Sequence, residues 1–178
     1  MSWILTHSGK KVDPFNPNPN DIVISDIIHA LSNICRFSGH TRRFYSVAEH
    51  SIFVSQHVDE EFKLTALLHD AAEAYLLDVP TPIKQLFPAY KEAEDRMLEI
   101  IMKKFGGLWP IPEAVKQEDE RMLATEAVYL LDANIAEWGL KTSPYACNFN
   151  TETAPNSADL QRYFFTIFDE LFRKVSRS

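Results

Sequence analysis

The stretch Leu64-Thr-Ala-Leu-Leu-His-Asp-Ala-Ala-Glu73 places two adjacent polar residues inside an otherwise apolar run. Its leucines and alanines predict a buried helix, which the flanking pattern extends over residues 62–75. Burying the His69 imidazole and the Asp70 carboxylate is costly unless the two groups are paired or bind a metal. The sequence therefore predicts a compensating partner here, and a hydrogen-bonded pair at a helix end is the simpler alternative.

Two other helices each bring one candidate ligand toward this pair. His50 is in register with the apolar residues of a helix expected over residues 46–58. Asp119 lies on the apolar stripe of a helix expected over residues 113–133, with a solvated acidic face as the alternative. Two imidazoles and two carboxylates suit a divalent ion such as Mn, Fe, Co, Ni or Zn and leave positions for water and substrate. Four metal ligands are predicted: His50, His69, Asp70 and Asp119.

The rest of the chain has helical periodicity almost throughout. Further helices are expected over residues 24–37, 90–105 and 158–175. A short helix is expected to begin at Pro80-Thr-Pro82, and residues 3–13 predict a β-hairpin. The polar segment 141–155 is expected to be a surface connection, because too little chain follows it to form a second core. We therefore expect one all-α domain over residues 1–178 with a short N-terminal β-hairpin.

Charge and composition exclude several classes of function. The chain has 18 basic and 25 acidic residues, a net charge of −7, which argues against a nucleic-acid partner. Its five glycines form neither a G-x-G-x-x-G pattern nor a P-loop, so a glycine-rich phosphate loop is not expected. No window approaches the ~18 apolar residues of a membrane span. Cys35 and Cys147 form no C-x-x-C pair, so we expect a reduced, cytoplasmic protein without a membrane partner.

The order of the candidate ligands resembles the H…HD…D signature of the HD-domain metal-dependent phosphohydrolases. Four blocks are similar to those of the bacterial 5′-deoxynucleotidase branch: Val47-Ala-Glu-His-Ser51, His69-Asp-Ala-Ala-Glu73, Asp78-Val-Pro-Thr-Pro-Ile-Lys84 and Lys116-Gln-Glu-Asp119. The opening of the chain, through Leu31-Ser-Asn-Ile-Cys-Arg-Phe-Ser-Gly-His-Thr41, is most similar to small phage and prophage HD hydrolases, including viral dATP triphosphohydrolases. The resemblance implies a compact HD-domain helical bundle, a divalent metal cofactor and a homo-oligomer, either a dimer or a hexamer.

The resemblance also implies roles for individual residues. Glu73 would orient or deprotonate the attacking water, and Asp78 would protonate the departing 5′-oxygen. As alternatives, Glu73 would support a metal ligand and Asp78 would cap the end of a helix. Candidates for contacts with the phosphates or the base are Arg36, Phe37, Arg43, Pro80, Lys84 and Lys116.

The first hypothesis is a hydrolase that splits dATP into deoxyadenosine and triphosphate, in the host cytoplasm if the chain is phage-encoded. A 5′-deoxynucleotidase that acts on deoxynucleoside monophosphates is the alternative, and it would share every catalytic residue. An alternative from another class is a non-catalytic nucleotide-binding or regulatory HD module. Against that alternative, no predicted site residue has been replaced by an inert one.

Overall fold

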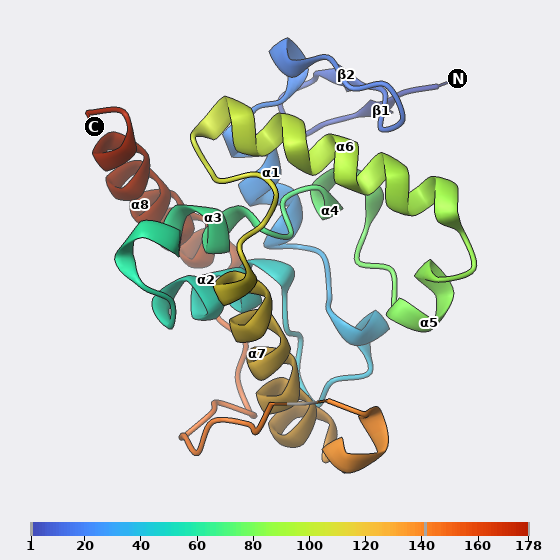
Figure 1. Ribbon diagram of the computed structural model, residues 1–178, viewed down its shortest axis with the longest axis vertical. Coiled ribbons are helices and arrows are strands. Elements are labelled where there is room, and N and C mark those ends of the chain that lie inside the picture. The colour runs from blue at the N-terminus through green and yellow to red at the C-terminus, as the bar shows by residue number, and fades with distance from the viewer. Residues whose placement is uncertain (1, 141, 178) are drawn as a thin grey trace.

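The computed structural model describes residues 2–140 and 142–177, which form a mostly helical fold with a hairpin at the N-terminal end (Figure 1). Strands β1 (Ile4–Leu5) and β2 (Lys11–Val12) of this hairpin pair antiparallel, and the turn between them contains Gly9 with a φ of +84°. The predicted all-α class with a short N-terminal hairpin is confirmed in this coarse form. Three residues lie outside the described part of the chain: Met1 and Ser178, the ends of the predicted domain, and Lys141, the first residue of the predicted surface connection.

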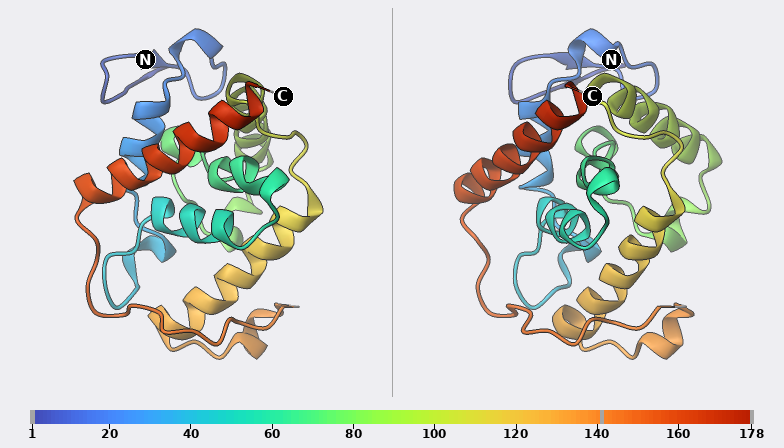
Figure 2. Two further views of the ribbon diagram at one scale, coloured as in Figure 1. Left: turned by 90° about the vertical axis from the view of Figure 1, so that its left-hand side faces the viewer. Right: turned by 60° about the vertical axis from the view of Figure 1, so that its left-hand side comes forward.

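The described residues form eight α-helices: α1 (Ile24–Leu31), α2 (Val47–Gln56), α3 (Lys63–Leu68), α4 (Glu73–Leu76), α5 (Thr81–Lys84), α6 (Pro88–Phe105), α7 (Glu113–Leu131) and α8 (Ser157–Val175). Short 3-10 turns lie at Pro19–Asp21, Phe37–Gly39, Glu60–Phe62 and Ile135–Trp138. Helix α2 packs against α3, α7 and α8. In the left view of Figure 2, α8 passes above the pair formed by α2 and α3, and α7 lies below this pair. Helix α2 is therefore central among these helices.

The longer predicted helices are confirmed with ends that shift by at most two residues, as α6, α7 and α8 show. Helix α2 is held at its start by a capping box: the Ser46 hydroxyl accepts from the Glu49 amide at 3.2 Å, and the Glu49 carboxylate accepts from the Ser46 amide at 3.3 Å. Such a cap contributes about 1 kcal/mol. It fixes the first turn of α2, and therefore His50, relative to the chain before it.

The helix predicted over residues 24–37 is wrong in extent, because α1 ends at Leu31. The next residues form a short extended pairing in which the Arg36 amide donates to the Tyr45 carbonyl at 2.9 Å. Phe37 and Ser38 then adopt left-handed φ values of 53° and 52°, which a continuing helix cannot contain. This reversal brings Arg36 back toward the start of α2.

The single helix predicted over residues 62–75 is also wrong, since α3 ends at Leu68 and α4 begins at Glu73. Tight turns join the two helices, with the Glu73 amide donating to the Asp70 carbonyl at 3.0 Å. The His69 ring gives a physical reason for the break. Its Nδ1–H donates to the Ala66 carbonyl at 2.6 Å and so competes with the amide that this carbonyl would accept in a continuous helix. His69 and Asp70 consequently lie at a junction.

Asp26 joins the hairpin to α1. Its buried carboxylate, 3% exposed, accepts hydrogen bonds of 2.7 Å from the Thr6 hydroxyl and from both the amide and the hydroxyl of Ser8. Burial raises the pKa of Asp26, but the hydrogen bonds from Ser8 and Thr6 and the charge of His7 outweigh burial, so the pKa lies below its usual value. The ionised carboxylate is therefore the form that holds the hairpin.

We expect Asp26→Asn to lower the free energy of unfolding at pH 7 by roughly 1–3 kcal/mol, because the amide nitrogen cannot accept from these donors. Since the folded-state pKa is lowered, this contribution is complete above the unfolded pKa of about 3.9 and is lost as the pH falls through the folded pKa. Urea unfolding of both proteins across this range measures the difference. Equal stabilities at pH 7 would contradict the assignment.

Candidate metal centre

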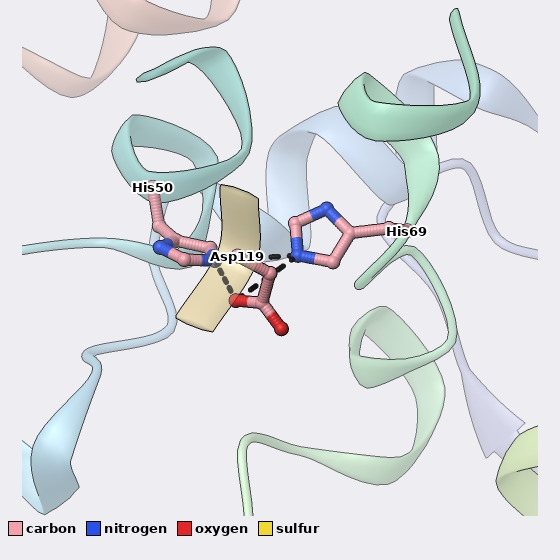
Figure 3. A group of neighbouring side chains, drawn as sticks. All are labelled: His50, His69 and Asp119. Carbon is pink, nitrogen blue, oxygen red and sulfur yellow. Dashed lines mark hydrogen bonds and ion pairs between the residues drawn. The ribbon is translucent and has the colours of Figure 1, made fainter. Parts of the chain in front are cut away.

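Three side chains from different elements point toward one another (Figure 3). His50 comes from α2, His69 follows α3, and Asp119 comes from α7. Oδ1 of Asp119 lies 3.0 Å from His50 Nε2 and 3.6 Å from His69 Nε2, while the two Nε2 atoms are 3.2 Å apart. The ligand atoms all lie within 4.8 Å of one another, so this group of two buried histidines and a partly exposed aspartate could hold a metal ion.

Asp70 adds a second carboxylate to this group. Its Oδ2 lies 3.3 Å from His69 Nε2 and 3.6 Å from His50 Nε2. The same oxygen lies 3.4 Å from Nη1 of Arg36, a cation that the resemblance assigns to phosphate. The structure thus brings the four predicted ligands together, and their binding of a metal stays a prediction. We call His50, His69, Asp70 and Asp119 the His/Asp cluster.

The hydrogen bonds behind the two imidazoles suit a metal. Nδ1 of His50 lies 2.6 Å from Oε1 of Glu126, and Nδ1 of His69 lies 2.6 Å from the Ala66 carbonyl oxygen. Since an ionised carboxylate and a carbonyl can only accept, both Nδ1 atoms carry a proton. Each Nε2 atom is then the one that faces the cluster, which is the arrangement expected of histidines that bind metals.

The electrostatics also favour a positive charge between the two rings. Two neutral Nε2 atoms at 3.2 Å would point lone pairs at each other, so a proton or a cation is needed between them. Burial and the charge of Arg36 lower the pKa of His50, but the carboxylates of Glu126 and Asp119 overcome both and raise it to about 9. A proton and a metal ion would therefore compete for this position.

Two carboxyl groups beside the cluster are held closer to their protonated form. Glu73 is buried, and its Oε2 has no hydrogen-bond partner among the described residues. Burial raises its pKa well above the usual value, and the charges of Asp70 and Asp78 add to this effect. Burial also raises the pKa of Asp78, with Asp70 adding to it and Arg36 opposing it. Perturbed carboxyl groups of this kind are typical of sites where protons move.

Arg43 is held in place by several hydrogen bonds within the protein. Its Nη1 and Nη2 donate to the carboxylate of Glu49 at 3.1 and 2.9 Å, inside the protein. Nη1 also donates to the Phe44 carbonyl, and Nε donates to the Asn150 carbonyl at 2.9 Å. The planar fork that would bind phosphate is therefore engaged in holding α2 and a distant loop. These contacts do not test whether Arg43 also contacts phosphate, which stays a prediction.

The other predicted substrate residues differ in how free they are. Nζ of Lys84 donates to Glu94 on α6 at 2.7 Å, so its charge is partly neutralised. Lys116 is exposed on α7, and Pro80 immediately precedes α5. None of these positions excludes a contact with substrate, and their roles stay predictions.

Phe37 lies beside Arg36, with the guanidinium carbon 5.4 Å from the centre of the Phe37 ring. The ring of Trp138 approaches Phe37 with 6.3 Å between ring centres, and Trp138 is half-exposed. The sequence analysis missed Trp138, because it lies in a short 3-10 turn without a periodic apolar pattern. The predicted base-stacking face at Phe37 thus has a second aromatic side chain next to it.

Glu126 is a further residue that the sequence analysis missed. It is fully buried on α7 and contacts His50, Arg36 and Tyr45. Its spacing of seven residues from Asp119 places both carboxylates on the same face of the helix, which is a signal that could have identified it.

Comparison with known proteins gives relatives at two levels of identity. No protein-family model matches the chain. The uncharacterized protein YfdR of Escherichia coli strain K12 is 49% identical over 126 residues, which make up 71% of this chain and 71% of YfdR. The uncharacterized protein RCAP_rcc00048 of Rhodobacter capsulatus is 35% identical over an alignment of 150 residues, and the match covers 76% of this chain and 76% of that protein. Among the residues that the structure describes, no helix has the length and apolar character needed to span a bilayer.

Proposed function

The chain belongs to the family of YfdR and RCAP_rcc00048, whose names assign no activity, and from the geometry of the His/Asp cluster we propose a function: hydrolysis of deoxynucleotides by a divalent-metal-dependent phosphohydrolase of the HD-domain type. One observation carries the proposal. Ligand groups from three separate segments, in the order that resembles the H…HD…D signature, converge so that one carboxylate oxygen of Asp70 and one of Asp119 each lie 3.0–3.6 Å from the Nε2 atoms of both histidines.

The chemistry assigns a part to each group around the cluster. The His/Asp cluster would hold the cation, which when bound supplies Lewis acidity toward water and a phosphoryl oxygen. Arg36, which is paired with Glu126 and with Asp70, would place its guanidinium beside the phosphoryl group of the substrate. Glu73 would take a proton from the attacking water as the oxygen of that water bonds to phosphorus. The bond from phosphorus to the 5′-oxygen breaks, and Asp78 would give that oxygen its proton.

The raised pKa values support these two proton-transfer roles. A carboxylate with a raised pKa is a stronger base, which suits Glu73 for accepting a proton from water. A carboxyl group that keeps its proton to higher pH is a better donor near neutrality, which suits Asp78 beside an alkoxide leaving group. Both shifts begin with burial, so limited access of water to Glu73 and Asp78 is part of the proposed mechanism.

Two substrates are candidates within this function. The resemblance of the opening segment to phage enzymes favours dATP, which would give deoxyadenosine and triphosphate. A deoxynucleoside monophosphate is favoured by a different observation: Arg43 is occupied by Glu49, and Lys84 by Glu94, which leaves fewer cations for a β- and a γ-phosphate. We keep dATP as the first candidate and the 5′-deoxynucleotidase activity as the second.

Product analysis separates these candidates. We expect protein supplied with Co²⁺ to convert dATP into deoxyadenosine and triphosphate, and a chelator to abolish the reaction. ATP serves as the control for the sugar, and dAMP is incubated in parallel. Inorganic phosphate released from dAMP, without triphosphate from dATP, would replace the first candidate with the second. Nucleotide binding without turnover in Co²⁺, Mn²⁺, Ni²⁺, Zn²⁺ and Fe²⁺ would instead support a non-catalytic module.

A further inference from the structure

Glu126 lies behind the His/Asp cluster and does not belong to it. Its Oε1 accepts from Nδ1–H of His50 at 2.6 Å and from the Tyr45 hydroxyl at 2.8 Å. Its Oε2 accepts from Nε–H of Arg36 at 3.1 Å. Both oxygens of a fully buried carboxylate are therefore used, by donors from three different parts of the chain. This satisfies a charge that would otherwise be costly to bury.

The contacts of Glu126 decide how two functional groups face the cluster. Because Nδ1 of His50 is held as a donor, the opposite ring nitrogen, Nε2, is turned toward Asp119 at 3.0 Å. Because Nε of Arg36 is held on the same carboxylate, Nη1 of that guanidinium reaches Asp70 at 3.4 Å. One carboxylate thus sets the orientation of a predicted metal ligand and of the predicted phosphate-binding cation.

We propose that Glu126 is the positioning residue of this centre: it fixes His50 as the tautomer that binds metal through Nε2, and it holds Arg36 against Asp70. This inference rests on the proposed metal site. Partners that orient a metal-ligating histidine from behind typically change metal affinity by about 10–100-fold when they are removed. A merely structural ion pair would change stability without this effect on the metal.

Glu126→Gln tests the proposal with little change in volume. The glutamine side chain has one oxygen and one NH₂ group. If its oxygen accepts from His50, its NH₂ group faces the N–H donor of Arg36, and two donors cannot form a hydrogen bond. We expect the dissociation constant for Co²⁺, measured by calorimetry without substrate, to rise by about 10–100-fold. Glu118→Gln is the matched control, because Glu118 lies on the same helix and accepts from Tyr145 at 2.9 Å. Its Co²⁺ affinity should equal that of the wild type.

A spectroscopic readout reports the tautomer itself. In the wild-type protein loaded with ¹¹³Cd²⁺ and labelled with ¹⁵N, we expect coupling from the metal to Nε2 of His50, while Nδ1 keeps a slowly exchanging proton. In Glu126→Gln that proton should exchange faster. Coupling to Nδ1 of His50 in the wild type would overturn the proposal even if the variant does not fold.

The outcomes separate this inference from the function beneath it. A folded Glu126→Gln protein that binds Co²⁺ as tightly as the wild type would overturn the positioning role and leave the metal site standing. A wild-type protein that binds neither Co²⁺ nor Cd²⁺ would overturn both. Weaker binding in Glu126→Gln alone, with the Glu118→Gln control unchanged, is the result that supports the proposal.

Discussion

Asp119→Asn is expected to lower the rate of deoxynucleotide hydrolysis with Co²⁺ by about 10³-fold or more, since losing a Lewis acid removes several kcal/mol of stabilisation and each 1.36 kcal/mol is a factor of ten. Asp119 Oδ1 is the atom that both Nε2 atoms approach, at 3.0 and 3.6 Å. The amide carries no charge and would present either an oxygen or an NH₂ group to them. The negative charge of the Asp119 carboxylate is therefore central to holding a cation at this position.

The fold should survive this change, because the Asp119 side chain is 42% exposed and asparagine has nearly the same shape. Initial rates over a series of Co²⁺ concentrations measure the loss, and high Co²⁺ should restore part of the rate. Asp132→Asn is the control, because Asp132 is an exposed aspartate at the end of the same helix, where asparagine tolerates the left-handed backbone. A rate for Asp119→Asn within tenfold of the wild type would show that the carboxylate is not required.

Asp78→Asn is expected to lower kcat on a deoxynucleotide by about 10²–10⁴-fold and to leave the affinity for Co²⁺ unchanged. Burial and Asp70 raise the pKa of Asp78, which shifts its carboxyl group toward the protonated form that can donate. The 5′-oxygen of a nucleoside leaves as a strongly basic alkoxide unless it is protonated. Asparagine keeps the size of the side chain but has no carboxylic proton.

The leaving group provides the check on this role. With p-nitrophenyl phosphate, whose phenolate leaves without a proton, Asp78→Asn should lose far less activity than it loses with the deoxynucleotide that the wild type hydrolyses. Glu73→Gln should lose comparable activity on both substrates, because deprotonation of water precedes either cleavage. Parallel kcat measurements on the two substrates compare these effects. Equal losses for Asp78→Asn on both substrates would assign Asp78 a structural part instead.

The long helices could be predicted from sequence because periodicity over many residues decides them. Helices α6, α7 and α8 each present an apolar stripe to the core and end near the predicted residues. The short N-terminal hairpin was predictable from apolar residues around Gly9. In both cases the signal is local, so distant parts of the chain are not needed to interpret it.

The two wrong helices fail for a tertiary reason. The segment after Leu31 is periodic enough for a helix, but its backbone pairs with the chain before α2, as the bond between Arg36 and the Tyr45 carbonyl shows. The helix over 62–75 breaks where the His69 ring takes the Ala66 carbonyl. Propensity cannot reveal either competitor, because each depends on a partner chosen by the final fold.

The candidate site, like the fold, could be predicted from the sequence only in part. Residue type and order were enough to select the His/Asp cluster, since polar side chains in apolar helical stripes require partners. Arg43 was predicted to contact phosphate, and the sequence could not show that its Nε also donates to the carbonyl of Asn150, far along the chain. Glu126 was overlooked because a carboxylate in a long helix is ordinarily solvated. Only the folded contacts distinguish these two residues from surface charges.

The proposed metal centre is tested most directly by titrating metal-free protein with Co²⁺ and recording the visible absorption spectrum, which needs no substrate. We predict ligand-field bands that rise to saturation with at least one Co²⁺ per chain and that are lost in the variant carrying both His50→Ala and His69→Ala. Circular dichroism confirms that this variant is folded. Absence of saturable bands in the wild type, or identical bands in the folded double variant, would contradict the central claim that the His/Asp cluster binds the metal.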